Sequence, residues 1–113
     1  MTSCRLAIAM TVQLFLTQAV AEPIRIDGTG IVSCGTWTQQ RAPGTAIANI
    51  HANWIIGFVN GVRWAEERNW GPGIDAVGLV AWVDTYCQSN PLDSVAKAAG
   101  ALIDELKKRS SAQ

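Results

Sequence analysis

The sequence predicts an all-α protein, a small bundle of about four helices tied by one disulfide. Three observations predict this fold. Apolar residues recur at three- and four-residue steps along most of the chain beyond residue 30, which is the spacing of one helix face. Short stretches containing Pro, Gly and Asn separate these periodic segments. Cys34 and Cys87 lie in two different segments, so a bond between them would join two helices.

Residues 1–21 have the three-part layout of a cleavable secretory signal peptide. Arg5 supplies a positive charge, an uncharged apolar run follows, and Ala19-Val20-Ala21 provides small residues for cleavage. The alternatives are an uncleaved anchor and an amphipathic N-terminus. Thr and Gln residues interrupt the run, however, and it is shorter than the roughly 20 residues of a membrane span. We therefore expect cleavage, loss of Cys4, no membrane span afterwards, and a periplasmic or secreted protein.

Removal of this segment leaves residues 22–113, a chain of 92 residues that suits a single helical domain. It holds eight Lys and Arg residues, the total of nine without Arg5, against nine Asp and Glu residues. The resulting net charge near −1 gives no basic surface that would attract nucleic acid or anionic lipid. A domain of this size is only marginally stable, so a covalent cross-link would matter.

The two cysteines of this domain are expected to form that cross-link. An isolated pair in a small exported domain usually forms a disulfide. Closing a loop of 53 residue steps would stabilise the fold by about 4 kcal/mol on the chain-entropy model. Two free buried thiols or a metal site are the alternatives. His51 is the only histidine, and two cysteines with one histidine rarely complete a zinc site, so we expect no metal.

The first two helices follow from spacing and from helix-ending residues. Ile31, Cys34 and Trp37 predict a short helix within residues 30–41, after a loop or short edge feature at residues 24–32. A long second helix begins at the N-cap Thr45, is apolar on more than one face and is therefore expected to be largely enclosed. Its Gly57 and Gly61 lie on one side, where another helix could approach closely. The charged, Pro- and Gly-containing residues 66–73 end it.

Two further helices complete the bundle. Asp75 is the expected N-cap of the third, which runs to Ser89-Asn90 and carries Cys87 on its inward stripe. Asn90 and Pro91 are the expected N-cap and first turn of the last helix. The basic residues 107–109 suit the C-terminal end of that helix. The disulfide would then join the first helix to the third.

No motif in the chain predicts catalysis. Nucleophile-elbow, zinc-protease and phosphate-loop patterns are absent from the sequence, and Gly28-Thr29-Gly30 is too short to bind a phosphate. His51 lies at helical spacing from apolar residues, which favours a packing or interfacial role over that of a general base. The carboxylates are interpreted as loop, cap and surface charges. We therefore expect no enzymatic activity, no catalytic residue and no cofactor.

All five tryptophans lie beyond residue 21, which is a large share for so small a domain. Trp54 and Trp82 are expected to fill the core. Trp64 and Trp70 lie near the charged loop and are the candidate partner-binding residues, because exposed tryptophan supplies rigid contact area at protein interfaces. This hypothesis predicts a protein partner.

Several short motifs resemble known periplasmic proteins. Ser33-Cys34 opens a short helix, WIIGFVNG follows at 54–61, another helix ends in YCQSNPL, and the last helix is rich in Ala. This layout resembles the HdeA/HdeB-type acid-stress chaperones, in which a single disulfide links the equivalent helices. The segments IIGFVNGV and LVAWVDTYCQSNPLDSVAKAAGALIDEL are also similar to the Rap/Tai type of periplasmic immunity proteins.

The two resemblances imply different partners. The chaperone type implies a homodimer that dissociates at low pH and then binds many unfolded periplasmic clients. The immunity type implies one cognate effector, a cell-wall hydrolase. Both imply a small non-enzymatic helical protein that binds other proteins.

Overall fold

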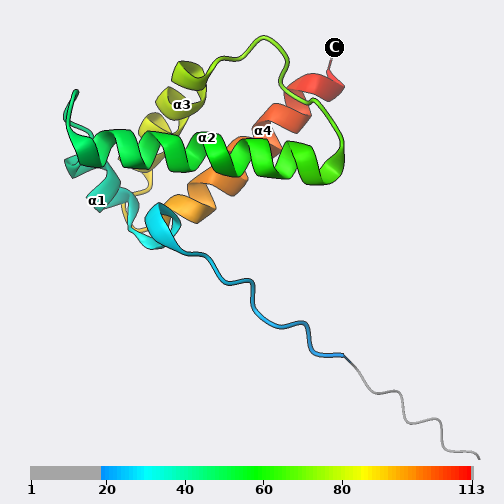
Figure 1. The fold of residues 1–113 in the computed structure, drawn as a ribbon, viewed down its shortest axis with the longest axis horizontal. Coiled ribbons are helices and arrows are strands. Elements are labelled where there is room, and N and C mark those ends of the chain that lie inside the picture. The colour runs from blue at the N-terminus through cyan, green and yellow to red at the C-terminus, as the bar shows by residue number, and fades with distance from the viewer. Residues whose placement is uncertain (1–18, 113) are drawn as a thin grey trace, which may run out of the picture.

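The computed structural model describes residues 19–112 (Figure 1). Cys4 and all but the last three residues of the expected signal peptide lie outside this range. The elements, in chain order, are the 3-10 helix η1 (Gly28–Ile31) and the α-helices α1 (Cys34–Gln39), α2 (Ala46–Glu66), α3 (Ala76–Ser89) and α4 (Val95–Ser111). Within the described residues no strand forms, and the only β-type pairing is an isolated bridge between Ser33 and Ser94. The predicted all-α fold is confirmed.

Each α-helix starts at a residue whose side chain caps its first turn. Ser33, Thr45, Asp75 and Ser94 each accept a hydrogen bond from the backbone N–H three residues further on. Such a cap satisfies one of the N–H groups that have no partner inside the helix. The predicted caps Thr45 and Asp75 are confirmed.

The predicted start of the last helix at Asn90 is wrong. Asn90 instead ends α3, and α4 begins at Val95 after its cap Ser94. The intervening segment bonds to the chain around α1: the N–H of Cys34 donates to Asp93 O at 2.7 Å, and the N–H of Val95 donates to Val32 O at 2.9 Å. These backbone groups are satisfied by a neighbouring segment, so the chain here does not need to be helical.

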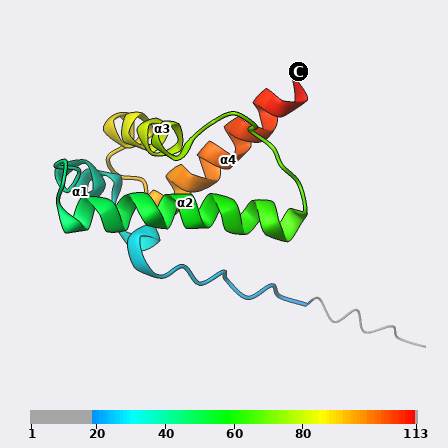
Figure 2. The same ribbon diagram turned by 45° about the horizontal axis from the view of Figure 1, so that its top comes forward.

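The disulfide between Cys34 and Cys87 is present and joins α1 to α3, as predicted. Both cysteines are fully buried in the core, which Trp37, Ile55 and Leu102 fill with the largest enclosed side chains. α1 is shorter than the predicted 30–41 helix, because η1 and an extended Val32-Ser33 precede it. The long α2 lies across α3 and α4, with α1 beside the start of α2 (Figures 1 and 2).

The outward side of α2 is open, contrary to the expectation that this helix is largely enclosed. Ile55 and Val59 face the core, whereas Ile50 is 58% exposed. A Cβ atom added to Gly57 or Gly61 would meet no atom within 4 Å. No helix within the described chain packs on these two glycines, so the expected close approach does not occur there.

Trp54 of α2 attaches the segment around η1 to the rest of the fold. Its Nε1–H donates to the backbone oxygen of Asp27 at 3.1 Å, and its ring lies against Gly30. A Cβ at Gly30 would come within 2.5 Å of the Trp54 ring and would also collide with Ile26. Gly30 therefore allows the backbone to approach the Trp54 ring closely. Gly28 has a positive φ of 71°, a conformation that glycine adopts without strain.

Candidate functional site: a groove between α2 and α3

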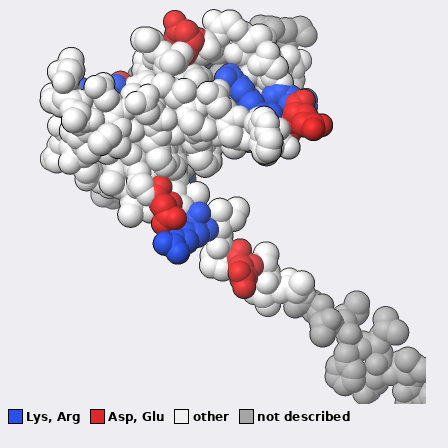
Figure 3. All heavy atoms as spheres, viewed as in Figure 1, with Lys and Arg blue, Asp and Glu red and all other residues white. Residues whose placement is uncertain are grey.

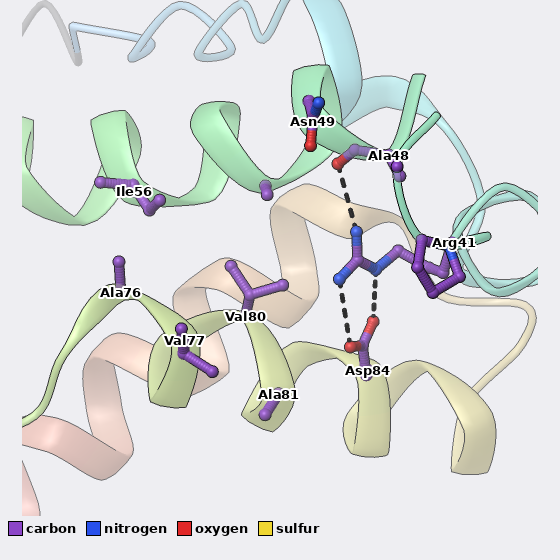
Figure 4. A pocket seen from close by; sticks show the side chains of 12 residues that line it. Arg41, Ala48, Asn49, Ile56, Ala76, Val77, Val80, Ala81 and Asp84 are labelled. Atoms are coloured by element: carbon purple, nitrogen blue, oxygen red, sulfur yellow. Dashed lines mark hydrogen bonds and ion pairs between the residues drawn. The ribbon is translucent and has the colours of Figure 1, made fainter. Parts of the chain in front are cut away.

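An apolar groove separates the N-terminal halves of α2 and α3 (Figure 4). Its volume is about 360 Å³, within the range of ligand pockets in proteins. The lining comes from three segments: Arg41, Pro43 and Gly44 before α2; Ala48, Asn49, Ala52 and Ile56 on α2; and Ala76, Val77, Val80, Ala81 and Asp84 on α3.

Short side chains account for the hollow. Ala48 and Ala52 lie one turn apart on α2 and line the groove together with Ala76 and Val80 of α3. Alanine side chains are too short to fill the space between two helix surfaces, so part of this space stays open. Val77, at the mouth, is 76% exposed. The groove therefore offers an apolar surface that no part of the described chain covers.

A half-buried ion pair closes one end of the groove. Arg41 donates from Nε to Asp84 Oδ1 at 2.7 Å and from Nη2 to Oδ2 at 3.4 Å, and its Nη1 donates to Ala48 O at 3.1 Å (Figure 4). The buried Trp37 also donates its Nε1–H to Asp84 Oδ1, at 2.7 Å. The pair connects α3 to α1 and to the start of α2, so it fixes the width of the groove at this end.

A smaller cavity of about 150 Å³ lies beside the same ion pair. Thr38 of α1 and Gln88 of α3 line it together with Arg41 and Asp84. The open side of α3 is thus apolar at its N-terminal end and polar at its C-terminal end. A bound segment would find apolar contacts first and uncharged hydrogen-bonding groups beyond the pair.

His51 lines neither cavity and is buried, with 2% of its surface exposed. Its Nδ1 lies 3.0 Å from the hydroxyl of Thr29, its Nε2 lies 2.9 Å from Oε1 of Gln40, and its ring stacks on Trp37. A neutral ring satisfies both bonds, with Nε2–H donating and Nδ1 accepting. Burial, and secondarily the charge of Arg41, lowers the pKa of His51. His51 is a packing histidine that joins η1, the end of α1 and α2.

The two candidate tryptophans do not form one exposed patch. Trp64 is 84% exposed near the end of α2, as expected, but Trp70 is only 4% exposed, so its expected exposure is wrong. The indole N–H of Trp70 donates to Glu66 at 3.0 Å, and the cations of Arg63 and Lys107 both lie over its ring. Trp70 thereby fastens the loop after α2 to α4. The charged residues near Trp70 therefore contact it inside the fold.

The other tryptophans pack internally. Trp54 and Trp82 are half-buried against the core, and each stacks on an aromatic residue four positions later on its own helix. Trp37 is the fully buried one, held by Asp84 and by the stacking on His51. Its spacing from Cys34 predicted a helix, but nothing in the sequence indicated its bond to Asp84.

Two carboxylates join helices at sites away from the groove. Glu66 accepts from Lys107 at 2.7 Å and from Trp70, and these hydrogen bonds lower its pKa. Asp93 accepts from the Tyr86 hydroxyl at 2.6 Å and from Lys97 at 3.1 Å, and these bonds lower its pKa. The hydrogen bond to Asp93 also raises the pKa of Tyr86.

Among residues 19–112, no cluster of three or more His, Cys, Asp or Glu side chains could hold a metal ion. No helix in that same range combines the length and the apolar character needed to cross a membrane. Comparison with protein-family models, with curated proteins and with solved structures found no match to this chain.

Proposed function

We propose that this protein is a small non-enzymatic binding protein that holds an apolar segment of another protein in the α2–α3 groove. The observation that carries the proposal is the groove itself, an open apolar surface with a defined shape. An exposed apolar surface rimmed by polar groups is typical of a protein-interaction site. The most concrete version is a stress chaperone of the HdeA type.

Export to the periplasm or outside the cell is part of this proposal. The two buried cysteines form a disulfide, and disulfides form and persist mainly in oxidising compartments. The three-part pattern of residues 1–21 points the same way.

The pKa directions support a response to acid. The folded protein lowers the pKa of His51, so as pH falls below the ordinary value of 6.5 the unfolded chain takes up the proton more readily and stability decreases. Glu66 and Asp93 also have lowered pKa values. Their contribution is present above their ordinary values of 4.5 and 3.8 and is lost as pH falls through the lower folded values.

These groups sit at three different junctions of the fold. His51 joins η1 and the end of α1 to α2, Glu66 joins α2 to α4, and Asp93 lies between α3 and α4. The charges beside them are Arg41 at His51, Lys107 and Arg68 at Glu66, and Lys97 at Asp93. Acid therefore weakens the contacts of α2 at His51 and Glu66 and the contact between α3 and α4 at Asp93, while the disulfide keeps α1 joined to α3. Such loosening would enlarge the apolar surface open to an acid-unfolded client.

The test is protection of an acid-denatured protein from aggregation, followed by light scattering at about pH 3 and at neutral pH. We expect protection in acid and a loss of protection in Val77→Lys, which places a charge at the mouth of the groove at both pH values, because a lysine stays protonated throughout this range. Val77 is exposed, so the ammonium group can reach water and the fold should remain intact, which circular dichroism checks. Thr85→Lys, an exposed site on α3 outside the groove, is the matched control. Equal lack of protection at both pH values would contradict the chaperone version.

A second candidate is a periplasmic immunity or inhibitor protein. The observation that favours it is that Asp84, by accepting from Trp37 and Arg41, sets the shape of the groove before any partner binds. A preformed groove suits one cognate partner better than many loose clients. Capture from a periplasmic extract at neutral pH would then recover one cell-wall hydrolase, and Val77→Lys would abolish its capture while Thr85→Lys would not.

A further inference from the structure

Asp27-Gly28 joins an exposed N-terminal arm to the helical body of the protein. We define the arm as residues 19–26, of which 19–25 are exposed and only Ile26 is half-buried. Within the described chain, the backbone of the arm forms no hydrogen bond. Figure 3 shows the arm projecting from the body, with charged atoms of both signs close to where the two meet. The Asp27-Gly28 peptide is therefore open to water and free to move on its N-terminal side.

The reactive groups of this pair are almost unrestrained. The Asp27 carboxylate accepts from Arg25 at 3.1 Å, and both side chains are largely exposed, so the ion pair adds little rigidity. The carboxylate caps no helix, since η1 begins without a side-chain hydrogen bond. The N–H of Gly28 donates to no group of the described residues, and glycine has no side chain to crowd its nitrogen. Rotation of the arm can therefore bring the Asp27 carboxyl carbon against the Gly28 nitrogen.

The other aspartates of the chain lack this combination. None of them precedes a glycine. Three accept hydrogen bonds from side chains or from the first turn of a helix, and the fourth lies within α4; they are Asp75, Asp84, Asp93 and Asp104. Asp27 is thus the aspartate that combines a free carboxyl group with an unhindered glycine nitrogen.

A second pair, Asn60-Gly61, has the more reactive sequence but is held inside α2. An asparagine amide loses ammonia directly, whereas a carboxyl group is ionised at neutral pH and must regain a proton before its oxygen can leave as water. The Gly61 nitrogen, however, lies within the continuous helix Ala46–Glu66, where its N–H bonds to the carbonyl four residues before it. Attack by this nitrogen requires the helix to open locally. The fold thus protects the intrinsically faster pair and leaves the slower one open.

We propose that Asp27 is a site of spontaneous isomerisation to isoaspartate, with water as the only co-reactant. The Gly28 nitrogen bonds to the carboxyl carbon of Asp27 and loses its proton, while a carboxyl oxygen leaves as water, which gives a cyclic succinimide. Water then adds to either carbonyl of the ring and breaks the bond between that carbonyl carbon and nitrogen. Opening at the side-chain carbonyl restores aspartate, and opening at the main-chain carbonyl gives isoaspartate. No atom is oxidised or reduced, and the water lost in the first step is regained in the second.

Isoaspartate changes the main chain beside two contacts of η1. The chain then runs through the former side-chain carboxyl carbon and is longer by one methylene group before Gly28. In the unmodified protein the Asp27 oxygen accepts from Trp54 Nε1 at 3.1 Å, and Ile26 lies so close to Gly30 that a Cβ there would collide with it. The longer chain cannot keep both contacts in their present geometry, so the modification loosens the attachment of η1 to α2. Neither η1 nor the arm lines the α2–α3 groove, so this inference does not depend on the proposed function.

The test is incubation of the folded, oxidised protein at neutral pH in water labelled with heavy oxygen. Each passage through the succinimide leaves one labelled oxygen in the residue. After reduction, tryptic peptides 26–41 and 42–63 separate the two sites, and mass spectrometry measures label and isoaspartate in each. We expect more conversion at Asp27 than at Asn60 in the folded protein, and the reverse order in guanidinium chloride. Absence of label and isoaspartate at residue 27, or faster conversion at Asn60 in the folded protein, would overturn the proposal.

Two variants of residue 27 should keep the fold, because its side chain is exposed and caps nothing. Asp27→Asn places an Asn-Gly pair in the arm while the same pair remains in α2, so the intrinsic chemistry is matched within one molecule. Residue 27 should then convert at least about tenfold faster than Asn60, because only the second site needs the helix to open. Asp27→Glu is the negative control, since its longer side chain would have to close a larger ring that forms more slowly, and conversion should be lost. Equal rates at the two Asn-Gly pairs, or undiminished conversion in Asp27→Glu, would contradict the proposal.

The effect on η1 has its own measurement. The isoaspartate form, separated by ion-exchange chromatography under native conditions, should exchange the amide hydrogens of residues 29–32 several-fold faster than the fresh protein, with no change in α4. Equal exchange in the two forms would overturn the loosening of η1.

Discussion

Removal of the disulfide should cost this domain a large part of its stability. Cys34 and Cys87 are separated by 53 residues, and the chain-entropy model assigns a bridge across such a loop about 4 kcal/mol. Domains of this kind have a total free energy of unfolding of about 5–15 kcal/mol. We therefore expect Cys34→Ala/Cys87→Ala to lower that free energy by about 4 kcal/mol, with a further small loss because two fully buried sulfur atoms disappear from the core.

The assay is urea unfolding followed by tryptophan fluorescence. For a denaturant slope of about 1 kcal/mol per molar urea, the midpoint should fall by about 4 M. The loss should also be local. α1 has six residues, too few for an independent helix, and depends on the bridge and on its bonds to Asp84 and residues 91–93. Amide exchange in residues 34–39 should accelerate more than in α4. A midpoint within about 0.5 M of the unmodified protein would refute this account of the bridge.

Three further predictions concern single side chains. Gly30→Ala should destabilise the fold by about 1–3 kcal/mol in urea unfolding, because its Cβ would come within 2.5 Å of the Trp54 ring; an unchanged midpoint would contradict the close approach. Asp84→Ala should cost about 2 kcal/mol and lower the melting temperature, since it leaves the buried N–H of Trp37 without an acceptor, whereas Asp84→Asn should retain part of the stability. The free energy of unfolding should fall between neutral pH and about pH 5 in the unmodified protein and fall much less in His51→Gln, because the folded protein lowers the pKa of His51. Identical pH profiles of the two proteins would show that His51 does not cause this fall.

Local features of the sequence predicted the helices that depend on local contacts. Thr45 and Asp75 cap the helices that they were expected to cap, because a capping side chain bonds to a backbone group three residues away. The break at residues 66–73 is likewise local, as α2 ends at Glu66. The disulfide followed from cysteine number and domain size, with no need for geometry.

Three expectations failed where distant segments decide the outcome. Asn90 and Pro91 read as a helix start, but residues 91–95 bond to the chain around α1. Trp70 read as exposed, but Arg63 and Lys107 enclose it from two other parts of the fold. Gly57 and Gly61 read as a packing site, but no helix of the described chain reaches them. For Asn90 and Trp70 the deciding contacts include residues far away in the sequence, those around α1 and Lys107 of α4, and for the two glycines no neighbour is present in the described chain.

The sequence by itself determined the class of fold, the caps Thr45 and Asp75 and the pairing of the two cysteines, because periodicity, capping and composition act over a few residues or on the whole chain. Only the tertiary structure decided the groove, since its apolar walls come from α2 and α3 and its closed end requires Arg41 to meet Asp84, 43 residues away. It also decided which tryptophans are buried. Burial depends on what packs above a side chain, and that is fixed only when the helices come together.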